Sequence, residues 1–204
     1  MTAATYGDME TRIADEIDRT DIAVSYIPNA ILDAIKYFES DHFDFNEEVR
    51  DFTLVQGDAR LSLPSDFMTI VSISIVYNDV YYPLTSRNYT ELEQIDHKTQ
   101  ARPVVYCQFA SALRLYPYPD QAYQGNMSYI KQFTTLSATT DTNVWTTIAE
   151  PMIREKAKAY IYRNRLKDFD RAAIHEQFAQ DEYRNLKQKA AYNQTSGRLV
   201  VEYP

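Results

Sequence analysis

The spacing of apolar residues changes twice along the chain, and this constrains the fold more than any other feature. Up to about residue 40, apolar side chains recur every three or four residues, as in amphipathic helices. Between about 48 and 134 they alternate with polar residues in short runs separated by turn residues, which is typical of strands. Helical spacing returns from about 147 to 192. This order predicts an α+β fold in which N- and C-terminal helices form one bundle, with an antiparallel β module inserted.

Two helices are predicted before residue 40. In the first, Met9, Ile13 and Ile17 follow at four-residue intervals, and Thr5 is a candidate N-cap. The second is expected to begin at Pro28, a preferred first-turn residue, and to reach about residue 39. The helices at 6–40 should therefore bury one apolar stripe each.

Two further helices are predicted after residue 147. A capping-box pattern at Thr147 and Glu150 predicts the start of the first, with Pro151 tolerated in its first turn. Asp168 or Asp170 is expected to cap the second. The apolar residues of this last helix are Ile174, Phe178, Leu186 and Ala190.

The inserted module is expected to contain six or seven short strands. Asn78 and Asp79 form a hairpin-type turn between the strand-like segments 70–77 and 80–82. Residues 87–95 are consistent with a short helix that crosses between sheet segments. Pro117 is expected at a sheet edge or corner, because proline cannot donate a ladder hydrogen bond.

Residues 195–204 are predicted to form an extended docking tail after a single domain that comprises residues 1–194. Gly197 ends the helical pattern, and a β-branched, apolar segment without a nearby hairpin partner follows it. Such a strand either docks on a neighbouring subunit or another protein, or closes the chain's own central sheet. The residues assigned to docking are Arg198, Leu199, Val200, Val201, Glu202 and Tyr203.

Charge and cysteine content narrow the class of protein. One cysteine, Cys107, fits a reducing compartment, and no apolar run is long enough to span a bilayer. The first residues lack the basic and apolar regions of a signal peptide, so we expect a soluble protein made in a cytoplasm, without a membrane partner. The net charge of −8 argues against a surface that wraps nucleic acid.

The charge is unevenly distributed along the chain. Residues 1–52 contain thirteen acidic and four basic residues, a net charge of −9, whereas residues 152–192 contain ten basic and six acidic residues, a net charge of +4. Such segments either attract each other, within one subunit or between neighbours, or form solvated helix faces.

The sequence contains no pattern typical of a catalytic or cofactor site. His42, His97 and His175 lie far apart, and the four glycines are scattered singly rather than in a phosphate loop. Cys107 lies in a strand-like stretch, which favours a buried apolar role. The adjacent acids Asp15–Glu16 and Glu47–Glu48 are expected to be solvated. We therefore expect no enzyme, metal or cofactor.

One basic segment is a candidate nucleic-acid face. Its bases are interleaved with Tyr160 and Tyr162, a pattern found in single-strand binding surfaces. A solvated or subunit-contacting face is the alternative interpretation. The basic residues concerned are Lys156, Lys158, Arg163, Arg165 and Lys167.

An ordered set of segments resembles the head-to-tail adaptor proteins of tailed bacteriophages, also called neck or head-completion proteins. The set spans nearly the whole chain, and its order rather than any single motif carries the resemblance. The segments are Arg12–Asp21, Ala30–Glu39, Phe43–Glu47, Leu63–Phe67, Leu113–Asp120, Asp141–Thr147 and Ile153–Ala157.

The resemblance implies a structural virion protein of the neck. Proteins of this type form a ring, usually dodecameric, that docks under the portal, extends the DNA channel and carries tail or nozzle proteins. It implies that residues 198–203 dock on a partner, and that DNA passes through the channel without specific binding. A DNA-binding packaging accessory, or a cell-wall hydrolase of the virion, remains the alternative function.

Overall fold

A computed structural model of the 204-residue chain describes residues 4–18, 25–95 and 99–194. The fold divides into two compact units, a helical unit formed by residues 1–45 and 133–204 and a β unit formed by residues 46–132. The predicted α+β class is confirmed, because helices from both ends of the sequence form one unit and the strands lie in the segment between them.

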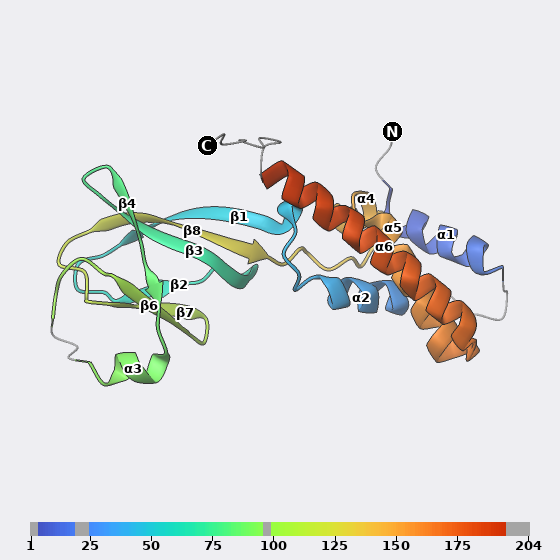
Figure 1. Cartoon of the computed structure of the whole chain (residues 1–204), viewed down its shortest axis with the longest axis horizontal. Coiled ribbons are helices and arrows are strands. Elements are labelled where there is room, and N and C mark those ends of the chain that lie inside the picture. Colours follow the sequence, from blue (N-terminus) through green and yellow to red (C-terminus); the bar gives the residue numbers. More distant parts are fainter. Residues whose placement is uncertain (1–3, 19–24, 96–98, 195–204) are drawn as a thin grey trace, which may run out of the picture. The chain divides into compact units, whose positions relative to one another are not determined.

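The helical unit combines N-terminal and C-terminal helices, coloured blue and orange to red in Figure 1. Its α-helices within the described ranges are α1 (Tyr6–Ile17), α2 (Tyr26–Phe38), α4 (Val144–Thr147), α5 (Glu150–Tyr160) and α6 (Phe169–Gln194). The predicted N-cap of α1 is confirmed, since Thr5 and Asp8 form a capping box. Helix α2 begins two residues before the predicted Pro28, which lies in its first turn.

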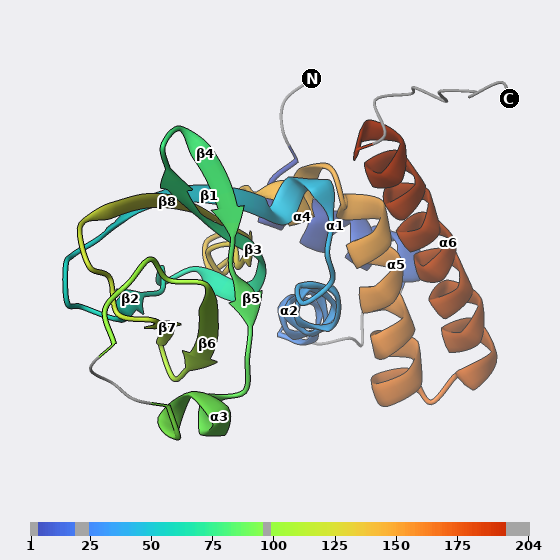
Figure 2. The ribbon, with the colours of Figure 1, turned by 60° about the vertical axis from the view of Figure 1, so that its left-hand side comes forward.

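Helix α5 is the centre of the helical unit. It packs against α1, α2, α4 and α6, and Figure 2 shows it between α2 and α6. The predicted stripes of α1 and α2 are buried here, with Ile13 and Ile31 completely inaccessible, as is Ile153 of α5. Burial of such side chains stabilises the unit by about 1.5–3 kcal/mol each.

An aromatic cluster lies where the chain leaves and returns to the helical unit. Phe45 and Phe133, the last residue before the β unit and the first after it, have ring centroids 6.5 Å apart. Both rings meet Trp145 edge to face, at 5.4 and 6.0 Å. Because the two ends of the inserted segment are held this closely, the helical unit can form around an insertion of many residues.

The start of α5 differs from the prediction. The capping box is formed by Asn143 and Thr146 on α4, whereas the Thr147 hydroxyl donates to the Asn143 carbonyl. Helix α5 begins at Glu150 without a side-chain cap, and the expected first-turn Pro151 is present. At α6 it is Asp168 that caps, because its Oδ1 accepts from the Arg171 backbone N–H at 3.0 Å.

The apolar residues expected in α6 lie on more than one face of the helix. Ile174 and Phe178 are half exposed, at 51% and 50%, whereas Ala172, Ala179 and Ala190 are buried. Alanines allow α6 to approach α5 closely, and the larger Leu186 packs against the same core. Ile174 and Phe178 thus lie outside the core, although they are among the most apolar residues of α6.

The β unit contains two four-stranded sheets within the described residues. One has the order β1-β8-β3-β4 and the other the order β2-β7-β6-β5. The strands are β1 (Glu47–Leu54), β2 (Arg60–Ser62), β3 (Phe67–Tyr77), β4 (Val80–Pro83), β5 (Thr85–Ser86), β6 (Val105–Phe109), β7 (Ala112–Tyr116) and β8 (Tyr123–Lys131). Asn78 and Asp79 both have positive φ, as the predicted hairpin turn requires.

One pair of strands departs from the predicted antiparallel arrangement. Strand β5 pairs with β6 in parallel. The connection between them contains α3 (Tyr89–Glu93), which confirms the predicted short helix. A crossover connection of this kind brings two strands together in the same direction, whereas a tight turn would make them antiparallel.

The two sheets share one core, and Gly125 makes room in it. Buried Ile75, Leu113 and Leu115 come from both sheets. Gly125 of β8 pairs with Phe52 of β1. A Cβ atom at Gly125 would collide with the Phe52 ring and with the Ser74 carbonyl oxygen. The glycine therefore lets an aromatic ring lie against the strand.

We predict that Gly125→Ala loosens the β unit selectively. The added methyl group must displace Phe52 and the backbone of β3, at a cost of about 1–3 kcal/mol. Hydrogen–deuterium exchange should accelerate in β1, β3 and β8 and remain unchanged in α5 and α6, since each unit has its own core. Gln124→Ala, next in β8 but exposed, is the control. Equal protection of β8 in both variants would contradict the packing role of Gly125.

Candidate interaction surfaces

Two of the five bases assigned to a nucleic-acid face are buried. Lys158 of α5 is 5% exposed, and its Nζ lies 2.5 Å from Glu16 Oε2 of α1 and 2.6 Å from Glu155 Oε1. Arg154 also pairs with Glu16. The acidic N-terminal and basic C-terminal segments thus attract each other within one subunit. Lys158 is therefore not available to nucleic acid.

The second buried base ties α5 to α6 and α2. Lys156 is 3% exposed, its Nζ lies 2.5 Å from Glu176 Oε1, and it lies 3.7 Å from the centre of the Tyr37 ring. A carboxylate and an aromatic face together compensate the charge that burial removes from water. The pattern of lysine and tyrosine in the sequence therefore reflects helix packing at this position.

Glu155 of α5 connects the Lys158 ion pairs to α6. Its Oε2 lies 2.7 Å from His175 Nδ1 of α6, and the His175 ring stacks on Tyr162 at 5.1 Å. Burial alone would raise the pKa of Glu155, but the hydrogen bonds with Lys158 and His175 outweigh it, so the pKa is lowered. The carboxylate is thus held ionised between two helices.

A groove of about 320 Å³ lies between α2 and the segment that follows α5. This segment, Ile161–Leu166, continues α5 as a π-helix, a rare form that widens the backbone. The guanidinium of Arg165 lies 4.5 Å from the centre of the Tyr26 ring at the groove. The groove is lined by Tyr26, Asn29, Asp33, Tyr160, Asn164 and Arg165, among others.

This groove is the surface that sequence reasoning missed. Its lining is rich in tyrosine and asparagine, which provide flat rings and adaptable hydrogen-bonding groups at protein interfaces. Tyr26 and Asn29 are separated from Asn164 and Arg165 by more than 130 residues in the sequence. No local pattern signals a π-helix, so only the fold brings these residues together.

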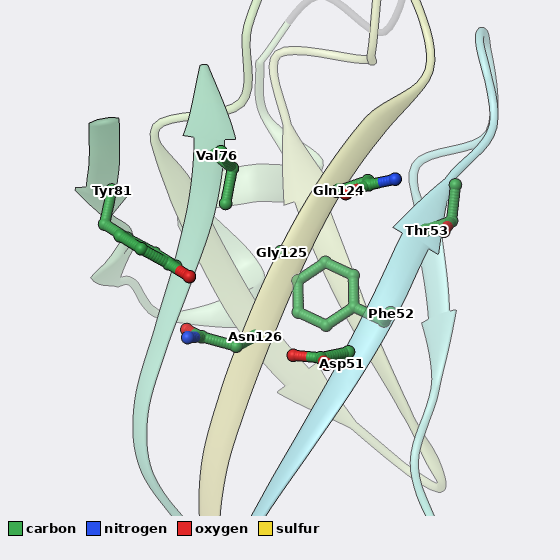
Figure 3. Close-up of a pocket in the computed structure, with 8 residues that line it drawn as sticks. All are labelled: Asp51, Phe52, Thr53, Val76, Tyr81, Gln124, Gly125 and Asn126. Carbon is green, nitrogen blue, oxygen red and sulfur yellow. The ribbon is translucent and has the colours of Figure 1, made fainter. Parts of the chain in front are cut away.

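A second hollow, of about 480 Å³, lies on one face of the β1-β8-β3-β4 sheet. Figure 3 shows Tyr81 and Asn126 pointing toward one another, with Asp51 on the neighbouring strand. The remaining lining side chains are Thr53, Val76 and Gln124, with Phe52 and Gly125 beneath them. One charged residue among polar and apolar ones makes this face suitable for contact with a protein.

The other candidate residues form no reactive site. Cys107 is buried, which raises the pKa of its thiol, and a backbone hydrogen bond with Arg114 partly offsets this. Its expected apolar role agrees with this burial. Within the described ranges, no three His, Cys, Asp or Glu residues are grouped as metal ligands. His97 and the predicted docking residues 198–203 lie outside the described residues.

Comparison with known families identifies the chain. A family model described as SU10 adaptor protein matches residues 4–201. The chain belongs to the SU10 adaptor protein family. It is accordingly a phage structural adaptor and a virion component, and the predicted resemblance to head-to-tail adaptors is confirmed. This family is not one of enzymes, and its adaptors interact with portal and tail proteins and form oligomers.

No curated protein matches the adaptor sequence significantly. In the part of the chain that the structure describes, no helix is both long and apolar enough to cross a membrane.

We predict that Glu155→Gln destabilises the helical unit at neutral pH by about 2 kcal/mol, since a charge-assisted network is lost. The folded pKa of Glu155 lies below its ordinary value of 4.5. The stabilisation is therefore complete above that value and disappears as pH falls through the folded pKa. Urea unfolding followed by the fluorescence of Trp145, buried in this unit, should show variant and wild type converging at acidic pH.

Asp15→Asn is the matched control for this prediction, because Asp15 is an exposed carboxylate on α1. It should leave stability unchanged within about 0.5 kcal/mol. A Glu155→Gln variant that matches this control at neutral pH would show that the network does not stabilise the unit.

Proposed function

We propose that this adaptor forms a ring, dodecameric by analogy with proteins it resembles, between the portal and the tail of a phage. The ring docks under the portal, extends the DNA channel and carries tail or nozzle proteins. The observation that carries this proposal is the family match over residues 4–201. The tyrosine- and amide-rich surfaces of both units support it, since a connector needs several contact faces without a reaction centre.

The proposed portal contact is the tail formed by residues 198–203. Its apolar, β-branched sequence suits strand addition to a sheet edge or insertion into a partner's pocket. Such docking provides backbone hydrogen bonds for affinity and alternate side chains for specificity.

The proposed channel face is acidic. Asp8, Asp15 and Asp18 are exposed on or next to α1, in the segment with a net charge of −9. A face of this sign repels phosphates, so DNA slides past it without specific binding.

We predict that the purified adaptor adds a ring to the portal vertex of DNA-filled, tailless heads, visible by electron microscopy. Deletion of residues 195–204 should abolish this attachment. Trp145 fluorescence and helical content should stay at wild-type values, because the described cores lie outside the tail. A truncated protein that docks normally would exclude the proposed role of the tail. Absence of a ring with the wild type would exclude the adaptor arrangement itself.

A DNA-binding packaging accessory is the alternative, and one observation favours it. Arg163, Arg165 and Lys167 remain exposed in the π-helix and just after it. This alternative requires duplex affinity that falls steeply with salt and is lost in an Arg163→Ala, Arg165→Ala double variant. For a channel adaptor we expect weak binding at moderate salt and no difference between the double variant and wild type, measured by fluorescence anisotropy.

A further inference from the structure

Helix α6 carries a second apolar face in addition to the one it buries. Ile174 and Phe178 are one turn apart and half exposed, and helical spacing places both away from the buried alanines, with Phe178 at the flank where its ring meets that of His175. We call these two residues the α6 ridge. Exposed apolar side chains that cluster on one helix face mark contact sites for another protein.

The groove between α2 and the π-helix is on a different flank of the same unit. Helix α5 packs against both α2 and α6 and lies between them (Figure 2). The ridge belongs to α6, whereas the groove is lined by α2 and by the segment that follows α5. Two different patches suit a head-to-tail contact, because this arrangement repeats from subunit to subunit and forms a ring when the rotation between neighbours closes.

The two surfaces also match in chemistry. The groove combines the exposed rim of Tyr26 with charges of both signs, Asp33 and Arg165. The ridge is flanked by the exposed Asp170, opposite in charge to Arg165, and by Arg171, which also pairs with Asp168 at 3.4 Å but stays exposed enough to meet Asp33 of a neighbour. An apolar knob between paired charges fits a tyrosine-lined groove with a polar rim.

We propose that the α6 ridge of one copy packs into the α2–π-helix groove of the next copy and that this is the lateral contact of the assembled adaptor. The occupant of the groove is thus a second copy of this chain. The proposal rests on the proposed ring and specifies which surfaces build it. It also gives the π-helix a role, since Asn164 and Arg165 form one wall of the groove.

The first test is site-specific cross-linking on rings bound to the portal. In a Cys107→Ala background, Gln177→Cys beside the ridge and Asn29→Cys in the groove should be joined by a short bismaleimide reagent into a ladder of multimers. Each single-cysteine variant should give dimers at most. Gln177→Cys combined with Thr53→Cys, on the exposed sheet face of the β unit, is the matched control pair and should give no ladder.

The outcomes separate this proposal from the proposed function. Rings that form at the portal without a ridge–groove ladder would overturn the lateral contact and leave the adaptor function intact. If wild-type protein forms no ring there, the adaptor arrangement fails, and the lateral contact is then judged by self-association of the free chain.

The second test measures this self-association by sedimentation at high protein concentration. Phe178→Asp and Ile174→Asp should each weaken it by about tenfold or more, as removal of a central apolar contact does. Gln188→Asp, exposed later on α6, should not weaken it. Trp145 fluorescence checks that each variant is folded. Equal association of all three variants and wild type would overturn the proposal.

Discussion

The ion pairs of α5 are the interaction on which the helical unit depends. Lys158 joins Glu16 from the N-terminal segment to Glu155, and Glu155 contacts His175 of α6. Moving an unpaired charge from water into such a site costs several kcal/mol, so each group is tolerated only where its partners are in place. Apolar packing alone would allow several arrangements of these helices. The charges favour one arrangement, in which α1 and α6 pack on either side of α5. Glu16 of α1 and His175 of α6 then face their partners on α5.

This constraint also explains how the chain accommodates a large insertion. Lys158 and Glu16 are 142 residues apart in sequence. Their pairing requires that residues before 46 and after 132 return to the same place. The aromatic cluster around Trp145 holds the two ends of the insertion together, and Lys187 adds a contact by donating to the His42 carbonyl. The β unit is then free to build its own core from its own residues.

The parts of the fold that could be predicted are those decided by neighbours in sequence. The Thr5 N-cap of α1 and the Asn78–Asp79 turn depend on a few adjacent residues, and both are present. The short helix before β6 has the same origin. Alternation of apolar residues placed most strands within a few positions, because the side-chain period of a strand is strict.

The features that could not be predicted depend on distant partners. From the sequence alone, Lys156 and Lys158 belong to a basic face. Only the structure shows that Glu176 pairs with Lys156 and Glu16 with Lys158. On α6, the alanines that pack inward have a weak apolar signal, whereas the more hydrophobic Ile174 and Phe178 remain half exposed, so apolarity alone does not identify the buried face. The groove required a π-helix, which no local pattern indicates.

The proposed ridge–groove contact implies assembly on a template rather than in free solution. Ile174 and Phe178 of α6 are left out of the subunit's own core, and each is only about half exposed. Because Lys156 and Lys158 are buried in ion pairs inside the subunit, they cannot strengthen a contact between subunits. A lateral contact built from one apolar ridge and a few rim charges would be weak alone. A portal that binds each subunit would raise their local concentration and make such contacts close the ring.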